Sequence, residues 1–447
     1  MLFDREMDYV DIPLDHKIRG KVLSAVSGSM TRRTCSSTAG TSAEPKHSNH
    51  TCRAKLPYKE TNMTRLFKPF DLNEIPLANR IVMAPMTRSR AANNIADERT
   101  ALYYAQRATA GLIVTEGSPI SREGQGYLFN PSIYSDEQVA GWKLTTDSVH
   151  AVGGKIFAQL WHVGRVSHTS LQPDGGAPRS ATSRLAKDSI VFAYDANGKP
   201  GFVPTSTPSA LSTMEVERVV EDFVSAATNA IEAGFDGVEI HAANGYLFEQ
   251  FLNPLVNDRT DRYSATTREN QLRFALEVVD GIAERIGTGK IGIRISPYGQ
   301  LFDMPHYPGI LDTYGALAFE LGMRRIAYIH VMDQSNVSVA PKDDTASDDR
   351  TIELLSRIKR EAGNTPIILA GGMTLNRAKA LLDDGLIDLA AFGQPFIANP
   401  DLVHRLKTGL PLATADRATY YGGGLKGYVD YPPFGAQFAA EPLENVA

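Results

Sequence analysis

Three residues near the middle of the chain, His241, Asn244 and Tyr246, carry side chains that can act together on a carbonyl compound. They come directly after a short apolar run, residues 237–240, which is typical of a buried strand. Neutral histidine and asparagine side chains can donate hydrogen bonds to an oxygen and stabilise negative charge that develops there. A tyrosine hydroxyl two residues further on can supply a proton to a neighbouring carbon. The string therefore predicts an oxyanion site with a proton donor beside it.

A metal site is the alternative interpretation of the same string. One histidine with an asparagine and no matching carboxylate makes a poor set of ligands. The two cysteines, Cys35 and Cys52, both lie in the first 62 residues, so the rest of the chain offers no thiolate for zinc or an iron–sulfur cluster. A bridge between these two cysteines is the alternative to two free thiols, which we favour. We expect no metal.

Eight short apolar runs after Met63 define the elements that must position these side chains. They cover residues 80–83, 112–115, 155–160, 237–240, 291–295, 326–331, 366–369 and 387–391. Runs that are apolar on both faces are typical of parallel strands covered by helices. Stretches with helical amphipathic spacing lie between them, at residues 215–233, 268–286, 348–362 and 375–384.

Eight strands that alternate with helices predict an α/β fold, a (β/α)8 TIM barrel. An open, doubly wound sheet is the structural alternative. No GxGxxG follows the first strand, however, as a dinucleotide-binding fold would usually show. One connection, residues 161–211, is too long for a plain loop and is rich in Pro, Gly and Ser. Loops of this length usually cover a functional site, so we expect a lid, with room for a small hairpin.

The residues just past the strand ends are expected to carry the chemistry of such a barrel. Here they are small or polar at nearly every strand, and they include Pro85, Met86, Thr87, Gly117, Gln159, Trp161, Arg294, Gly371, Gly372, Gly393 and Gln394. Backbone N–H groups can approach an anion where no Cβ intervenes, so the glycines after strands seven and eight suit a phosphate. Either glycine-containing turn alone is explained as a tight turn. The two turns together favour a phosphorylated cofactor.

Composition excludes several classes of function. The net charge is −5 and the pI about 6.1, so there is no broad positive field to hold nucleic acid or an anionic membrane. No apolar run is long enough to span a membrane. We therefore expect a cytoplasmic protein.

Residues 1–62 differ from the remainder, because the stretch 27–41 is rich in Ser, Thr and Gly with few large apolar residues, and we expect a disordered extension before a catalytic unit at 63–447. A segment for organellar import and a mis-called start codon are the alternatives for this extension.

Eight motifs are specific in combination. They are LANRIVMAPMTRSRA (77–91), GLIVTEG (111–117), FAQLWHVGR (157–165), HAANGYLFEQFLNPLVNDRTDRY (241–263), IRISPYG (293–299), ILAGGMT (368–374), FGQPFIANPDL (392–402) and GYVDYP (427–432). Together they resemble the Old Yellow Enzyme family of FMN-dependent oxidoreductases, from Leu66 to about Pro433. The chain resembles the classical branch of the family most, because that branch has threonine at the position of Thr87, where the thermophilic-like branch has cysteine.

The resemblance implies a set of residues for FMN. Pro85, Met86, Thr87 and Gly117 would line the isoalloxazine, with the Thr87 hydroxyl bonded to flavin O4. Gln159 would bond the pyrimidine edge, and Arg294 would stabilise the anionic reduced flavin near N1 and O2. The residues that would cradle the phosphate are Gly371, Gly372, Gly393 and Gln394.

The resemblance also implies the reaction, in which NADPH or NADH first reduces the flavin. His241 and Asn244 would bind the carbonyl or nitro oxygen of a small electron-poor alkene. Hydride would pass from flavin N5 to the β-carbon, and Tyr246 would protonate the α-carbon. The substrate pocket would be shaped by Trp161, Tyr421 and Phe302. We expect a monomer or a homodimer, and the resemblance leaves open a dedicated physiological substrate.

Gln394 departs from the family pattern, which usually has arginine there. A glutamine can still donate one hydrogen bond, but the charge-assisted bidentate pair with a phosphate is lost. A barrel that binds flavin without ene-reductase turnover, as a binding protein or with another acceptor, is therefore the alternative function. The presence of Thr87, His241, Asn244 and Tyr246 favours turnover.

Overall fold

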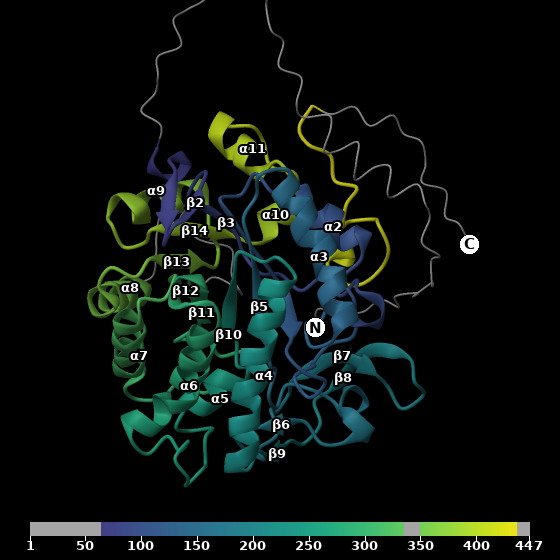
Figure 1. Cartoon of the computed structure of the whole chain (residues 1–447), viewed down its shortest axis with the longest axis vertical. Helices are drawn as coiled ribbons and strands as arrows, with labels where there is room; N and C mark the ends of the chain where they lie inside the picture. The colour runs from purple at the N-terminus through teal and green to yellow at the C-terminus, as the bar shows by residue number, and fades with distance from the viewer. Residues whose placement is uncertain (1–63, 335–348, 436–447) are drawn as a thin grey trace, which may run out of the picture.

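The structure is a computed structural model and describes residues 64–334 and 349–435 (Figure 1). Within these ranges, eight parallel strands close into a barrel, so the predicted (β/α)8 fold is confirmed. The strands are β3 (Ile81–Met83), β4 (Leu112–Pro119), β5 (Ile156–Trp161), β10 (Gly237–Ala242), β11 (Ile291–Ile295), β12 (Tyr328–Met332), β13 (Ile367–Ala370) and β14 (Leu389–Phe392). Each overlaps one predicted run. The predicted extension at 1–62, with both cysteines, lies outside the described residues.

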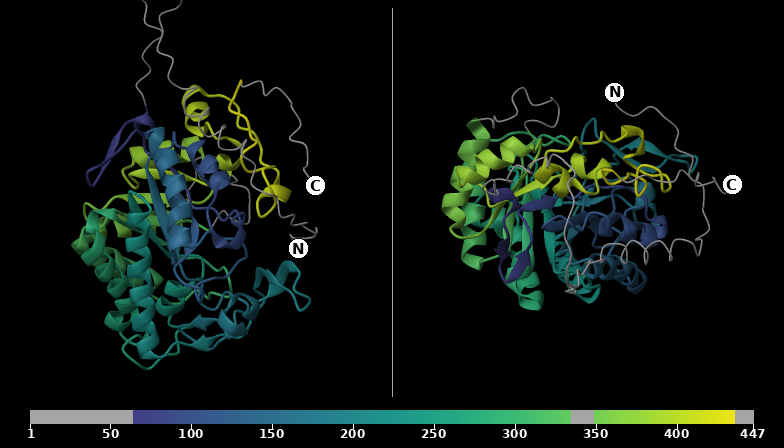
Figure 2. Two further views of the ribbon diagram at one scale, coloured as in Figure 1. Left: turned by 45° about the vertical axis from the view of Figure 1, so that its right-hand side comes forward. Right: turned by 90° about the horizontal axis from the view of Figure 1, so that it is seen from above.

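Helices cover the outside of this barrel (Figure 2). They are α2 (Glu98–Ala105), α3 (Asp136–Ala151), α4 (Thr213–Glu232), α5 (Leu247–Leu252), α6 (Arg268–Ile286), α7 (Ile310–Arg324), α8 (Asp349–Ala362), α9 (Leu375–Asp383), α10 (Gln394–Ala398) and α11 (Leu402–Thr408). The four predicted helices are all present. Helix α4 begins two residues before its predicted start because Ser212 and Glu215 form a capping box at its N-terminus.

A short hairpin of β1 (Phe70–Leu72) and β2 (Ile75–Leu77) was not predicted, because its strands have only three residues each. Leu72 and Leu77 belong to the buried cluster that fills one end of the barrel. In the turn between the strands, Asn73 Nδ2 donates a hydrogen bond to the Ile326 carbonyl, 3.3 Å away, just before β12. The hairpin therefore closes the N-terminal end of the barrel, away from the strand ends where chemistry is expected.

The long connection after β5 contains two small sheets, β6 (Arg179–Ser180) with β9 (Ser209–Ala210), and β7 (Ile190–Tyr194) with β8 (Pro200–Pro204). The second pair is antiparallel, so the hairpin expected in this connection is present. It lies on the opposite side of the molecule from the β1–β2 hairpin (Figure 2). Its residues Val191 and Phe192 share a buried cluster with Trp161 and Tyr246. The connection thus covers the strand ends.

Among the described residues, no helix is both long enough and apolar enough to cross a membrane.

Candidate active site

Aromatic side chains from separate segments meet at the C-terminal end of the barrel. The indole of Trp161, at the end of β5, is stacked between Tyr127 and His241, with ring centroids 5.5 and 5.8 Å away. The ring of Tyr246 meets Trp161 edge-on, at 4.9 Å, and lies 5.3 Å from Phe302. Edge-to-face and offset contacts at these distances are favourable and hold the rings in fixed orientations. The predicted residues Trp161, His241, Tyr246 and Phe302 therefore form one group.

His241 is a neutral hydrogen-bond donor in this site. It is 4% exposed, and burial, with the positive charge of Arg294 beside it, lowers its pKa well below the ordinary value. The Ala243 backbone N–H donates to His241 Nδ1 at 3.4 Å. A neutral imidazole whose Nδ1 accepts must carry its proton on Nε2. Nε2 is therefore the atom that His241 can present to an oxygen.

The Asn244 amide is oriented by its neighbours. Its backbone has a φ of 59°, a left-handed conformation that asparagine tolerates better than most residues. Its N–H donates to Ser296 Oγ at 2.7 Å, and its Oδ1 accepts from Gln334 Nε2 at 2.8 Å. Because Oδ1 is engaged, Nδ2 is the group left to donate. Two neutral donors, on His241 and Asn244, therefore come from one turn after β10.

Tyr246 keeps its proton in the folded protein. The side chain is 7% exposed, and burial, together with the nearby hydroxyls of Tyr127 and Tyr421, raises its pKa well above the ordinary value. Its hydroxyl lies 3.2 Å from the Tyr127 hydroxyl, within hydrogen-bond distance. A neutral phenol beside two neutral N–H donors is suited to give a proton to a carbon of a substrate that these donors hold.

Close packing at β4 and β5 forms the wall beneath these rings. Gly117 lies in β4 next to Trp161, and a Cβ at this position would come within 2.5 Å of Trp161 Cε3. Only glycine lets the indole lie flat against this strand. Pro85, Met86 and Thr87 follow β3 and are half-buried. Met86 Sδ is 3.5 Å from the position of a Cβ on Gly393, so the ends of β3 and β14 meet.

A buried polar cluster lies inside the barrel below the mouth. The Gln159 amide donates from Nε2 to Glu239 Oε1, and His330 Nδ1 bonds to Glu239 Oε2, both at 2.8 Å. Burial opposes ionisation of Glu239, but its interactions with His330 and Arg294 and the hydrogen bond from Gln159 together outweigh burial and lower the pKa of Glu239. The Gln159 amide is therefore fixed with its oxygen available to accept. Arg294 lies beside the cluster, 5% exposed.

The predicted phosphate residues lie at the ends of β13 and β14. Gly371 and Gly372 have φ angles of 105° and 53°, and a Cβ on Gly371 would lie 2.0 Å from the Asp333 carbonyl oxygen. Gly393 precedes helix α10, whose first residue is Gln394. The Gln394 side chain is exposed, and its Nε2 donates to the Tyr420 hydroxyl at 2.7 Å. The structure therefore brings both glycine turns to one edge of the mouth.

These residues fit a flavin mononucleotide. Arg294 Nε and Trp161 Nε1 are buried and have no hydrogen-bond partner among the described residues. A buried, unsatisfied N–H is costly, so each is a candidate donor to a bound group. The Gln159 oxygen is an acceptor, and the glycines of the two turns have no Cβ to keep a phosphate from their backbone N–H groups. The mouth of the barrel thus offers polar donors and an acceptor near the aromatic group, and a phosphate cradle at one edge.

Sequence reasoning missed several residues of this site. Tyr127 comes from the loop after β4, and no pattern in that loop marks it. Glu239 and His330 lie inside apolar strands. An ionisable residue within an otherwise apolar strand was the signal in the sequence that could have identified them. Tyr421, by contrast, was predicted to shape the substrate pocket; it comes from the C-terminal segment and is 38% exposed. Its hydroxyl is close enough to raise the pKa of both Tyr127 and Tyr246, which places it at the same mouth.

Comparison with known proteins adds independent support. The model of the NADH:flavin oxidoreductase / NADH oxidase family matches residues 65–413. The chain is 41% identical over 370 residues to putative 12-oxophytodienoate reductase 11 of Oryza sativa subsp. japonica, covering 82% of this chain and 97% of that protein. It is 39% identical to 12-oxophytodienoate reductase 1 of the same plant, covering 82% and 92%.

Solved structures of related proteins have the same fold. Morphinone reductase in complex with tetrahydroNAD matches with a TM-score of 0.76 and 43% identity, covering 82% of this chain and 97% of that one. The Old Yellow Enzyme homologue from Zymomonas mobilis matches with a TM-score of 0.75 and 36% identity, covering 82% and 99%. With the family match and the site geometry, these similarities lead to one conclusion. The chain belongs to the Old Yellow Enzyme family and is an FMN-dependent oxidoreductase that uses a nicotinamide reductant.

Proposed function

We propose that this enzyme reduces the C=C bond of small alkenes activated by a carbonyl or nitro group. The observation that carries the proposal is the neutral trio at the mouth, in which His241 Nε2 and Asn244 Nδ2 are the donors left for a substrate oxygen and Tyr246 holds a phenolic proton beside them. Such donors stabilise the negative charge that grows on the oxygen when the β-carbon is reduced. The same class of compound fits the relatives named for 12-oxophytodienoate and morphinone reduction.

Each residue has one task in this mechanism. His241 and Asn244 hold the activating oxygen, and Trp161 and Phe302 confine the alkene against Tyr246. Tyr246 gives its proton to the α-carbon, and the neighbouring Tyr127 hydroxyl can pass a proton from solvent to the phenolate, so that both tyrosines end the turnover protonated. FMN, reduced by NADPH or NADH, supplies hydride to the β-carbon when bound. One hydride and one proton add across the double bond, so the reaction balances.

The residues that would hold FMN divide by the part of the cofactor they suit. Gln159 and Arg294 offer an acceptor and a cation for the polar edge of the ring, with Pro85, Met86, Thr87 and Gly117 along the ring. Gly371, Gly372, Gly393 and Gln394 suit the phosphate. A fixed cation beside the ring favours its reduced, anionic form. The bond from Gln394 to Tyr420 ties the phosphate edge to the C-terminal segment that carries Tyr421.

The proposal is tested by visible spectroscopy of the holoenzyme without oxygen. Addition of NADPH should bleach the flavin absorbance, and 2-cyclohexen-1-one should then restore it, with cyclohexanone as the product. A protein that bleaches but is not reoxidised by the enone would reject alkene reduction in favour of another acceptor. A protein that purifies without flavin and does not take up added FMN would reject both alkene reduction and the flavin-binding alternative, with Gln394 as the first suspected cause.

Replacement of Tyr246 by phenylalanine tests the proton donor. Tyr246→Phe keeps the ring that packs on Trp161 but removes the hydroxyl, so flavin reduction by NADPH should change little. Reoxidation by 2-cyclohexen-1-one should slow by roughly 10²–10⁴-fold, the usual contribution of a positioned general acid. Stopped-flow absorbance measures both steps separately. Equal slowing of the two steps would contradict the assigned role.

We also propose that the enzyme is cytoplasmic and is a monomer or a homodimer. A near-neutral pI and only two cysteines in 447 residues support the cytoplasm as the compartment. Monomer and homodimer both fit a site built within one chain. Fractionation of cells and light scattering of the purified protein test these two points.

A further inference from the structure

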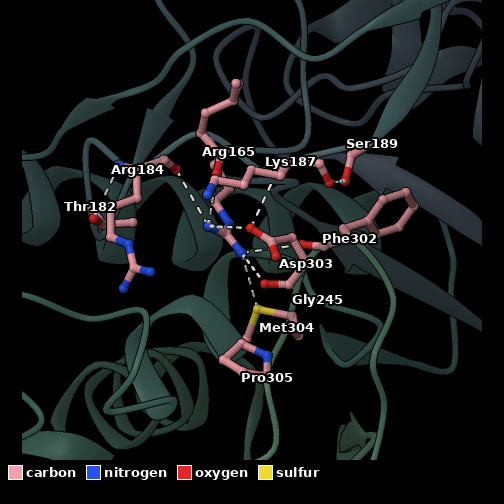
Figure 3. Close-up of polar contacts among 12 residues, drawn as sticks. Arg165, Thr182, Arg184, Lys187, Ser189, Gly245, Phe302, Asp303, Met304 and Pro305 are labelled. Carbon is pink, nitrogen blue, oxygen red and sulfur yellow. Dashed lines mark hydrogen bonds and ion pairs between the residues drawn. The ribbon is translucent and has the colours of Figure 1, made fainter.

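Arg165 connects two loops that border the mouth of the barrel. It lies four residues after Trp161, and its side chain is 1% exposed. Its Nη2 donates to the carbonyl oxygens of Phe302 and Asp303, at 3.1 and 2.8 Å. Its Nη1 donates to the carbonyl oxygens of Arg184 and Leu185, at 3.4 Å each. Figure 3 shows the guanidinium between these two segments.

The loop that Arg165 holds has an unusual backbone. Phe302 and Asp303 are consecutive non-glycine residues with left-handed φ angles, 55° and 58°. Side chains disfavour this conformation, so two in succession need contacts from outside the loop to persist. The two bonds from Nη2 go to the carbonyls of these same two residues. Arg165 is therefore placed to stabilise the conformation that aims the Phe302 side chain.

Two further contacts fix the loop from other sides. The Lys187 backbone N–H donates to Asp303 Oδ2 at 3.2 Å, so the connection after β5 also touches the loop (Figure 3). On the side of the catalytic turn, a Cβ on Gly245 would lie 2.5 Å from the Leu301 carbonyl oxygen. Residue 301 thus packs directly against the residue that precedes Tyr246. A shift of this loop would therefore also displace the turn that carries Tyr246.

Phe302 is the residue through which such a shift would reach a substrate. Its ring lies 5.3 Å from the Tyr246 ring, at 38° to it, and is half-buried. Tyr246 delivers the proton to the α-carbon in the proposed reaction. A substituent on the α-carbon must therefore lie next to Tyr246 and close to Phe302.

We propose that Arg165 is a positioning residue that holds Phe302 over Tyr246 and thereby limits the size of the α-substituent on the alkene. The proposal rests on the proposed function. An arginine suits the task because its planar fork can donate to several carbonyls at once, which a lysine cannot do. Arg165 touches neither substrate nor cofactor, and it acts through the loop at 301–304.

The test compares 2-cyclohexen-1-one with 2-methyl-2-cyclohexen-1-one, which differ by one methyl group on the α-carbon. In Arg165→Met holoenzyme, the preference in kcat/KM for the unsubstituted enone should fall by roughly tenfold, the usual scale for one methyl in a pocket. The change should lie mainly in KM for the methyl compound. In Phe302→Ala enzyme the preference should fall similarly, and adding Arg165→Met to it should change nothing further, as for coupled residues.

Controls separate this role from general support of the fold. Asp303→Asn removes the negative charge 4.0 Å from Arg165 but leaves the backbone carbonyls and an amide oxygen that can still accept from the Lys187 N–H, so its preference should match that of the wild type. Arg165→Lys keeps the charge with fewer donors and should give an intermediate preference. An unchanged preference in Arg165→Met, or an equal further change in the Phe302→Ala background, would overturn the proposal. Failure of both Arg165 variants to fold would also overturn it, because the residue would then serve stability.

The proposed function is checked within the same experiment. Wild-type enzyme that does not reduce 2-cyclohexen-1-one rejects alkene reduction itself. Wild-type enzyme that reduces it, with variants that keep its preference, rejects only the role of Arg165.

Discussion

Behind the catalytic turn, the buried carboxyl group of Glu249 supports the backbone of Asn244 and Gly245. The Gly245 N–H donates to Glu249 Oε2 at 2.5 Å, and the Ser296 hydroxyl donates to Oε1 at 2.7 Å. Ser296 Oγ also accepts the N–H of Asn244, so the carboxyl group and the oxyanion donor share one partner. Burial raises the pKa of Glu249 to about 7 despite these hydrogen bonds. The conformation of the catalytic turn is therefore linked to a group that titrates near neutral pH.

Glu249→Gln should weaken the dependence of stability on pH. The folded protein binds the Glu249 proton more tightly than the unfolded chain, whose carboxyl titrates near 4.5. The stabilisation is therefore complete below pH 4.5 and is lost as the pH rises to about 7, by up to about 3 kcal/mol. Glutamine stays neutral and removes this contribution. Denaturant unfolding of holoenzyme between pH 5 and 8 measures the slope.

The slope should decrease in this variant without disappearing, because burial also raises the pKa of Glu116 to about 7. Glu221→Gln, on the exposed face of α4, serves as the surface control. A Glu249→Gln slope equal to that of the wild type would show that the carboxyl does not titrate in this range.

At the scale of elements, the contact between β4 and β5 determines where the central indole lies. The register of the two strands shifts between Val114 and Gly117, at an irregularity in the pairing. Such bulges re-aim side chains next to active sites. Gly117 then lies under Trp161, which stacks on His241 and Tyr127. The contact between β4 and β5 thus positions the Trp161 indole, and through it the stacked rings of His241 and Tyr127.

Gly117→Ala should disturb this stack. The new methyl group would lie 2.5 Å from Trp161 Cε3, so the indole must shift from its position between Tyr127 and His241. Overpacking of this kind costs about 1–3 kcal/mol in the free energy of unfolding. The affinity for a phenol such as p-hydroxybenzaldehyde, measured from its effect on the flavin spectrum, should fall as well. Gly201→Ala in β8, where a Cβ meets no atom within 4 Å, is the matched control. Tight phenol binding by Gly117→Ala would show that the indole does not need this glycine.

At the scale of the whole molecule, two arginines from the loop after β3 hold the C-terminal segment against the barrel. Arg88 donates to the carbonyl oxygens of Tyr420 and Gly427, at 2.9 and 2.8 Å. Arg90 donates to those of Thr419, Gly424 and Lys426, at 2.7 to 3.2 Å. The segment runs alongside α2, where Tyr103 stacks on Tyr428 with ring centroids 4.3 Å apart (Figure 1). These contacts bring Tyr421 to the mouth.

Arg90→Leu should release this segment from the barrel. Carbonyl oxygens that accept from Arg90 would lose their donors, at a cost of about 1–3 kcal/mol for each that stays buried. Backbone amides at residues 417–428 should exchange with deuterium faster, while those of β12 keep their protection. Exchange mass spectrometry of the holoenzyme measures both regions. Arg360→Leu, at an exposed position on α8, controls for loss of a surface charge. Unchanged exchange at 417–428 would show that Arg88 alone suffices.

The sequence by itself determined the barrel and the part of it that carries chemistry. Two-sided apolar runs and helical spacing are properties of a few neighbouring residues, so they predict strands and helices without knowledge of the fold. Once eight such units are known, closure brings all strand ends to one mouth. His241, Asn244 and Tyr246 could be identified for the same reason, because they lie within six residues of each other. The short β1–β2 hairpin could not be predicted, because a strand of three residues is too short to show a periodic pattern of apolar residues.

Only the tertiary structure decided which atoms face a substrate. Tyr127 reaches Tyr246 across 119 residues, Glu239 reaches His330 across 91, and Gln334 orients Asn244 across 90. The tautomer of His241 and the free amide of Asn244 follow from these surroundings and from burial. The Arg165 contacts with the Phe302 loop span 137 and 138 residues. A sequence pattern records local periodicity, whereas partners this distant are selected by barrel closure and by the need to satisfy every buried donor.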